Sequence, residues 1–169
     1  MPGLELSRKM SDIGIVLPAY NEEKNINRAI GTAKKHLRNS FIVIVDDGST
    51  DRTYALAATA GVKVLKHASN KGNGEALRTA FNDFLKRKPG VKFVVVADAD
   101  MQYDIADSKK IIRALSAGQA DFVTGYRDFS KVHLRHRLGN FVWKTAINLL
   151  FGTNFKDTNC GFICVTRDA

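Results

Sequence analysis

Short apolar runs alternate along the chain with longer amphipathic stretches. The runs at 13–20, 41–51, 62–67, 91–100, 121–127 and 161–169 are rich in valine, isoleucine and phenylalanine, and they predict strands. The stretches at 21–37, 51–60, 70–88, 107–117 and 139–151 have helical spacing of apolar residues, and they predict helices. This alternation predicts an α/β fold with a mostly parallel sheet covered by helices on both faces.

Two helices and the last run carry more detailed expectations. Asn21 is a candidate cap for the helix at 21–37, with acids in its first turn and basic residues in its last. In the helix at 70–88, Leu77, Phe81 and Leu85 lie on one face. The run at 161–169 is expected to begin a new unit.

Acidic side chains follow the buried run at 94–96. In an extended segment alternate residues share a face, so Asp98, Asp100 and Gln102 present oxygen atoms to one side. Mg²⁺ takes one or two carboxylates and leaves its other positions to water and substrate phosphates, which suits a nucleotide diphosphate. The alternative is that the acids cap the next helix, a role we expect for Asp104 and Asp107.

Two glycine-containing motifs follow other strands. In VDDGSTD (45–51), Asp46 or Asp47 either accepts a hydrogen bond from a base or ribose or serves only the turn. NKGNGEA (70–76) echoes the GxGxxG loop of dinucleotide-binding proteins. However, Leu77 replaces the third glycine and the loop follows the third strand, so the motif does not favour nicotinamide binding.

Composition narrows the class of partner. The 169 residues suffice for one domain, and a net charge of +9 implies an anionic partner, unless the charge only solvates the surface. The basic residues are spread over many helices without a recognised motif, so we expect no nucleic-acid partner. Cys160 and Cys164 lack the paired spacing of a zinc site and are expected to be reduced, as in a cytosolic protein. The sequence shows neither a signal peptide nor an apolar run of membrane-spanning length.

Six motifs occur in an order that resembles a known family. They are PAYNE (18–22), VDDGSTD (45–51), NKGNGEA (70–76), DADMQ (98–102), TGYR (124–127) and DTNCGF (157–162). Their order resembles the family 2 inverting glycosyltransferases of GT-A fold, and within them the dolichol-phosphate mannose and glucose synthases. The resemblance implies a Rossmann-like, three-layer catalytic domain over residues 12–169, preceded by an extension at 1–11. Because the family usually continues past the GF motif, we expect the chain to be truncated at its C-terminus.

The resemblance also implies roles for individual residues. The nucleotide would contact Pro18, Tyr20, Glu22, Val45, Asp47, Asp98, Arg127, Arg135 and Arg137. A Mg²⁺ or Mn²⁺ ion would be held by Asp98, Asp100 and Gln102. Asp100, Arg127 and Asp157 are the expected catalytic residues. The family usually has GSR where this chain has TGYR, and often a serine near the position of Gly139.

The implied reaction is inverting transfer of a hexose from a GDP-mannose or UDP-glucose type donor to dolichyl or polyprenyl phosphate. A lipid phosphate is already anionic and needs no general base, whereas a saccharide hydroxyl would need one. No glutamate follows Glu75, so Asp157 is the best candidate base, unless it is a structural carboxylate. Transfer to a saccharide hydroxyl and a non-catalytic nucleotide-binding module remain the alternatives.

A basic segment and an apolar helix bear on the acceptor. The loop at 127–137 contains Arg127, Lys131, Arg135 and Arg137, which suits an anionic acceptor at the inner face of the cytoplasmic membrane, unless it is merely solvated. We therefore expect a peripheral cytoplasmic protein. In the helix at 139–151, the stripe of Trp143, Ile147 and Leu150 either packs into the core or lies at the membrane interface.

Overall fold

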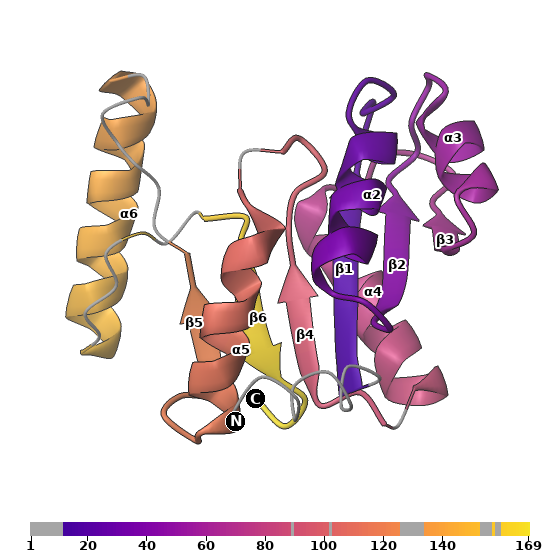
Figure 1. Cartoon of the computed structure of the whole chain (residues 1–169). Helices are drawn as coiled ribbons and strands as arrows, with labels where there is room; N and C mark the ends of the chain where they lie inside the picture. Colours follow the sequence, from indigo (N-terminus) through magenta and orange to yellow (C-terminus); the bar gives the residue numbers. More distant parts are fainter. Residues whose placement is uncertain (1–11, 89, 102, 126–133, 153–156, 158–159) are drawn as a thin grey trace.

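A computed structural model describes residues 12–169, apart from 89, 102, 126–133, 153–156 and 158–159, and apart from the side chains of 134–138 and 140. The expected extension at 1–11 lies outside the described residues. Six strands form one sheet in the order β3-β2-β1-β4-β6-β5 (Figure 1). Their bounds are β1 Ile13–Ala19, β2 Phe41–Asp46, β3 Lys63–Lys66, β4 Phe93–Val96, β5 Phe122–Thr124 and β6 Ile163–Thr166.

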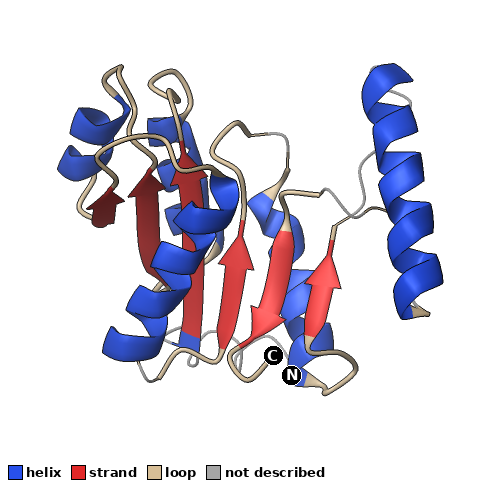
Figure 2. Ribbon diagram, turned by 180° about the vertical axis from the view of Figure 1, so that it is seen from behind, coloured by secondary structure: helices blue, strands red, loops and turns tan. Residues whose placement is uncertain are grey.

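Helices cover both faces of the sheet, which gives three layers. The helices are α2 Ile26–His36, α3 Thr53–Thr59, α4 Asn73–Arg87, α5 Ser108–Ser116 and α6 Leu134–Phe151, and a 3₁₀ turn, η2, spans Ile105–Asp107. One buried apolar cluster joins the sheet to α2, α3 and α5, and a second joins it to α4 on the opposite face. Figure 2 shows α4 crossing its face of the sheet, while α6 stands beyond the β5 edge.

The sheet is mostly parallel, as the alternation predicted. β1 runs parallel to β2 and β4, and β2 runs parallel to β3. The expectation that the last strand begins a new unit is wrong, because β6 lies antiparallel between β4 and β5. Cys164 at its centre pairs with Val95 on one side and Val123 on the other, so the insertion buries an apolar strand on both edges. Burial raises the pKa of the Cys164 thiol to about 12, which keeps it protonated.

Two helices begin five residues away from their expected starts, and the other starts differ by one to three residues. α2 begins at Ile26, and Asn21 has a positive φ of 56° instead of capping the helix. The Asn21 side chain instead accepts a hydrogen bond from the Thr50 N–H at 2.9 Å, because the loops after β1 and β2 lie together. α6 begins at Leu134, five residues before Gly139, so it includes part of the segment expected to be a basic loop.

The most deeply buried face of α4 is not the stripe of Leu77, Phe81 and Leu85, although Leu77 and Phe81 also pack against the core. Ala76, Ala80 and Phe84 are buried there, and the Phe84 ring lies 2.7 Å from where a Cβ on Gly14 would stand. Alanine at positions 76 and 80 lets the helix approach the strands closely, and glycine at position 14 leaves room for the Phe84 ring. Leu77, Phe81 and Leu85 instead line an apolar groove of about 540 Å³ over β4, β6 and β5.

Two of the three residues in the stripe of α6 are exposed, and the third, Ile147, is partly exposed, so core packing is not seen for these described side chains. Trp143 is 62% exposed and Leu150 is 75% exposed. The other interpretation, an interfacial helix, stays a prediction. None of the described helices is long and apolar enough to cross a membrane.

Candidate functional site

A pocket of about 220 Å³ opens where β1, β2 and β4 end. In an open α/β sheet the carboxyl ends of the strands are where ligands bind. The pocket brings together six residues singled out from the sequence, namely Pro18, Tyr20, Glu22, Asp47, Asp98 and Asp100. The remaining lining residues are Ala19, Asn70, Gly72, Asn73, Ala76 and Ala99.

Hydrogen bonds between the loops after β1 and β2 position the mouth of the pocket. The Asn21 N–H donates to the Ser49 hydroxyl at 2.9 Å, and the Glu22 N–H donates to the Thr53 hydroxyl at 2.7 Å. Asp51 accepts from the Glu23 N–H at 3.1 Å. Burial alone would raise the pKa of Asp51, but hydrogen bonds from the Thr53 hydroxyl and from backbone N–H groups lower it below its ordinary value. The segment 49–53 thus anchors the loop that carries Tyr20 and Glu22.

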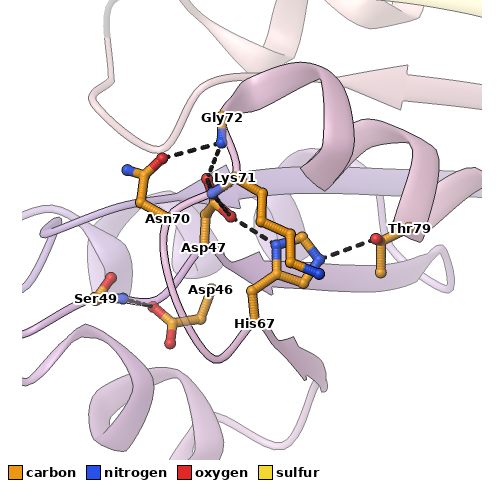
Figure 3. A network of polar contacts seen from close by, with 8 residues as sticks. All are labelled: Asp46, Asp47, Ser49, His67, Asn70, Lys71, Gly72 and Thr79. Carbon is orange, nitrogen blue, oxygen red and sulfur yellow. Dashed lines mark hydrogen bonds and ion pairs between the residues drawn. The ribbon is translucent and has the colours of Figure 1, made fainter.

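Asp47 is the centre of a buried polar network (Figure 3). One carboxylate oxygen lies 2.6 Å from His67 Nδ1, and the two oxygens together accept hydrogen bonds from the N–H groups of Lys71 and Gly72 at 2.8–3.1 Å. The other ring nitrogen of His67 lies 2.9 Å from the Thr79 hydroxyl in α4. Burial alone would raise the pKa of Asp47, but the hydrogen bonds from His67, Lys71 and Gly72 lower it, so Asp47 is an anion at neutral pH.

The Asp47 network sets one wall of the pocket. It holds the segment 70–72 just before α4, whose first turn lines the pocket at Asn73 and Ala76. A helix N-terminus carries partial positive charge and free N–H groups, and no side chain caps this one. The wall therefore combines the N–H dipoles at the start of α4 with the carboxylate of Asp47.

Asp98 and Asp100 form the acidic part of the pocket. Ala97 and Ala99 are buried in the core, whereas the alternating Asp98 and Asp100 are partly exposed and line the pocket. Both acids thus line the same pocket, although β4 ends at Val96, residues 99 and 100 form a turn, and φ is positive at Met101 (65°). The Asp98 carboxylate fills the space where a Cβ on Gly161 would stand.

The donor set fits a hard divalent cation that also binds substrate. Among the described residues no three histidine, cysteine or acidic side chains cluster as a complete metal site. Two carboxylates are nevertheless the usual protein share for Mg²⁺, whose other ligands are then water and phosphate oxygens. The third expected ligand, Gln102, lies outside the described residues.

Other expected site residues lie elsewhere. The Val45 side chain is fully buried in the α4-side core, so a contact with nucleotide would have to use its backbone. Asp157 is only 1% exposed and is absent from the lining of the pocket. Arg127 lies outside the described residues. Arg135 and Arg137 lie in the first turn of α6, and their side chains lie outside the described residues.

Some residues of the site were not selected from the sequence. Asn70, Gly72 and Asn73 line the pocket, although NKGNGEA was read only as a poor dinucleotide loop and as a family motif. The sequence did contain a signal for these residues, namely a glycine turn that opens a helix, because such turns often contact phosphate. His67 had no such signal, because a single histidine after a strand has no distinctive neighbours in the sequence.

Comparison with solved structures identifies the class of fold. Glucosyl-3-phosphoglycerate synthase from Mycobacterium tuberculosis, solved with Mn²⁺, UDP-glucose and glycerol 3-phosphate, superposes with a TM-score of 0.75. The two chains are 21% identical, and the match covers 97% of this chain and 60% of the other. This likeness confirms the GT-A fold expected from the sequence.

Sequence comparison gives the family. The model of the family described as Glycosyl transferase family 2 matches residues 14–168, so the chain belongs to that family. An uncharacterized protein of Methanocaldococcus jannaschii is 34% identical, over 94% of this chain and 66% of its own length. A UDP-N-acetylglucosamine–dolichyl-phosphate N-acetylglucosaminyltransferase of Methanococcus voltae is 28% identical, over 93% and 70%. Polyprenol monophosphomannose synthase of Mycolicibacterium smegmatis is 27% identical, over 91% and 61%. The chain thus spans about two thirds of the length of these relatives.

Proposed function

We propose that the protein is a metal-dependent glycosyltransferase that moves a hexose from a nucleotide diphosphate sugar to a polyprenyl or dolichyl phosphate, with inversion. The observation that carries the proposal is the pocket itself, where Asp98 and Asp100 lie in one lining with the first turn of α4. Acids that hold a cation, together with a helix N-terminus, suit the two faces of a diphosphate. Membership of glycosyl transferase family 2 supports the same chemistry.

In this proposal Asp98, Asp100 and Gln102 would hold Mg²⁺ or Mn²⁺. The bound ion would neutralise the charge that develops on the departing diphosphate. The carboxylates keep the cation at the pocket, and the N–H groups at the start of α4 add fixed dipoles that need not reorganise during the reaction. Tyr20 and Glu22, anchored at the mouth, lie where they can border the base and ribose.

The acceptor is proposed from chemistry and from relatives. A lipid phosphate attacks as an anion, so no general base is required of Asp157. One relative acts on dolichyl phosphate and another is named for polyprenol, which supports a polyprenyl phosphate acceptor. Arg127, Arg135 and Arg137 would bind donor or acceptor phosphate at the inner face of the cytoplasmic membrane, toward which a net charge of +9 is attracted.

The first test is thermal unfolding of the protein with UDP, GDP and NAD, each with Mn²⁺ and then with EDTA. A ligand at a hundredfold excess over its Kd stabilises the folded state by about 2.7 kcal/mol. One nucleoside diphosphate is expected to raise the Tm only with metal, which also decides between UDP-glucose and GDP-mannose types of donor. Asp98→Asn and Asp100→Asn should each abolish the shift, while Asp168→Asn, an exposed acid near the chain end, should not. An equal shift with EDTA would contradict the proposed metal site.

Transfer assays separate the alternatives for the acceptor. Product with polyprenyl phosphate that survives Asp157→Asn supports the proposal. Product only with a saccharide acceptor, lost in Asp157→Asn, would instead assign Asp157 as a base. Nucleotide binding with no transfer to either acceptor would favour a non-catalytic nucleotide-binding module.

A further inference from the structure

We propose that His67 is a positioning residue of the donor pocket, which acts by orienting the Asp47 carboxylate. The proposal rests on the proposed function, since it assigns a role in binding the nucleotide donor. His67 follows β3, its backbone N–H donates to the Asp46 carbonyl at 2.9 Å, and its ring is buried. The ring does not line the pocket, so its effect must pass through Asp47.

The direction of the hydrogen bonds follows from the partners. An ionised Asp47 can only accept, so His67 Nδ1 carries the proton that it shares across 2.6 Å. The Thr79 hydroxyl either donates to a neutral Nε2 or accepts from a protonated one, and both arrangements keep the donor toward Asp47. His67 thus links α4, through Thr79, to the end of β2.

The Asp47 carboxylate needs this donor to keep its orientation. His67 contacts Oδ1, the Lys71 N–H donates to both carboxylate oxygens, and the Gly72 N–H donates to Oδ2. A buried carboxylate that loses a donor turns toward whatever donors or water remain. That turn would release the two N–H groups that hold the segment before α4.

The consequence falls on the geometry of the pocket. Gly72 and Asn73 line the pocket together with Asp98 and Asp100. A donor diphosphate that contacts the start of α4 and also the two acids would be bound only if the distance between these two parts of the pocket is maintained. Misplacement of a positioned group by about 1 Å can cost up to about a hundredfold in the rate of the reaction that depends on it. We therefore expect His67 to control nucleotide affinity without touching the nucleotide.

The matched variants are His67→Asn and His67→Gln. The Asn Nδ2 takes the place of the ring Nδ1 and can donate to Asp47, whereas the Gln Nε2 takes the place of the ring Nε2 and reaches toward Thr79. Titration with the nucleoside diphosphate that stabilises the wild type, in Mn²⁺, should give His67→Asn a Kd near that of the wild type. His67→Gln should bind at least about tenfold more weakly.

This ordering separates positioning from packing. Gln is closer to His in length, so a residue that only filled space would tolerate Gln better than Asn. Equal affinities for the two variants, or tighter binding by His67→Gln, would overturn the proposal. Asp83→Asn provides a destabilised control, since it removes a buried partner of Lys63 and Arg87 outside the pocket and should leave the Kd unchanged.

Amide hydrogen exchange tests the same idea without any ligand. The Lys71 and Gly72 amides should exchange faster in His67→Gln than in His67→Asn, because only Asn retains the donor to Asp47. If the wild type bound no nucleotide, the proposed function would fail while this comparison still decided the positioning role. Equal exchange rates in the two variants would overturn that role.

Discussion

The Asp98 carboxylate occupies the space where Gly161 has no side chain. These two residues are distant in the sequence, and β6 beside β4 brings them together. A glycine in such a position lets a functional group approach the backbone closely. The absence of a side chain at Gly161 thus leaves room for the Asp98 carboxylate in the acidic part of the pocket.

Gly161→Ala should therefore impair metal-dependent nucleotide binding more than stability. The new Cβ would overlap the Asp98 carboxylate, and the end of a side chain can move where backbone cannot. We expect the Kd for nucleotide in Mn²⁺ to rise by about tenfold, with the free energy of unfolding lowered by less than about 1 kcal/mol. Calorimetric titration and urea unfolding measure the two quantities.

The matched control at this scale is Gly31→Ala. Gly31 lies in α2, and no atom beyond its chain neighbours and the helix's own backbone lies within 4 Å of its added Cβ. Alanine should stabilise the helix by about 0.5–1 kcal/mol and leave nucleotide binding unchanged. Unaltered binding in Gly161→Ala as well would show that Asp98 does not need its observed position.

Among the connections between elements, the turn after β2 and the loop after β3 are in direct contact. Gly48 has a φ of 75°, and a Cβ there would overlap the backbone of Ser69. The contact brings the β2 turn against the segment that leads into α4. It complements the hydrogen bonds of Asp47, the residue that precedes Gly48.

Gly48→Ala should destabilise the protein and separate these two loops. The positive φ alone costs about 1–2 kcal/mol for a residue with a Cβ, and overlap with backbone adds to that cost. Gly118→Ala is the control, because its φ is 69° but no atom lies within 4 Å of its Cβ. Urea unfolding should show a larger loss for Gly48→Ala, and equal losses would refute the importance of the contact.

Over the whole molecule, stability should decline in acid. The folded-state pKa values of Asp47 and Asp51 lie below the ordinary value of 3.8. These two carboxylates therefore add to the free energy of unfolding at pH values above 3.8. This contribution is lost as the pH falls through the folded-state values, because the unfolded chain then binds more protons. The free energy of unfolding, measured with urea from pH 7 to pH 2, should therefore fall steeply below about pH 4.

Asp51→Asn isolates one of these contributions from general charge repulsion. The variant should be less stable than the wild type at pH 7, and the difference should shrink toward pH 2. Asp168→Asn, which changes the same charge at an exposed position, should follow the wild-type curve. Parallel curves for Asp51→Asn and the wild type would contradict the lowered pKa.

The apolar pattern predicted most of the fold, and the acids at the ends of the strands predicted part of the pocket. Alternation predicted the α/β class because periodicity and burial are local properties of a segment. It also placed Asp98 and Asp100 on one side, since side chains alternate along extended backbone. The resemblance of six motifs supplied Tyr20 and Glu22, which no local pattern would have selected.

Other features depended on contacts between distant segments. The insertion of β6 between β4 and β5 follows from pairing in space, and no periodicity encodes it. The same holds for the contact of His67 with Asp47 and for the role of Gly161 beside Asp98. The sequence by itself determined which segments are strands or helices and which acids end them, because those properties arise from neighbours along the chain. Only the tertiary structure decided which side chains meet, since that depends on how the strands are ordered in the sheet.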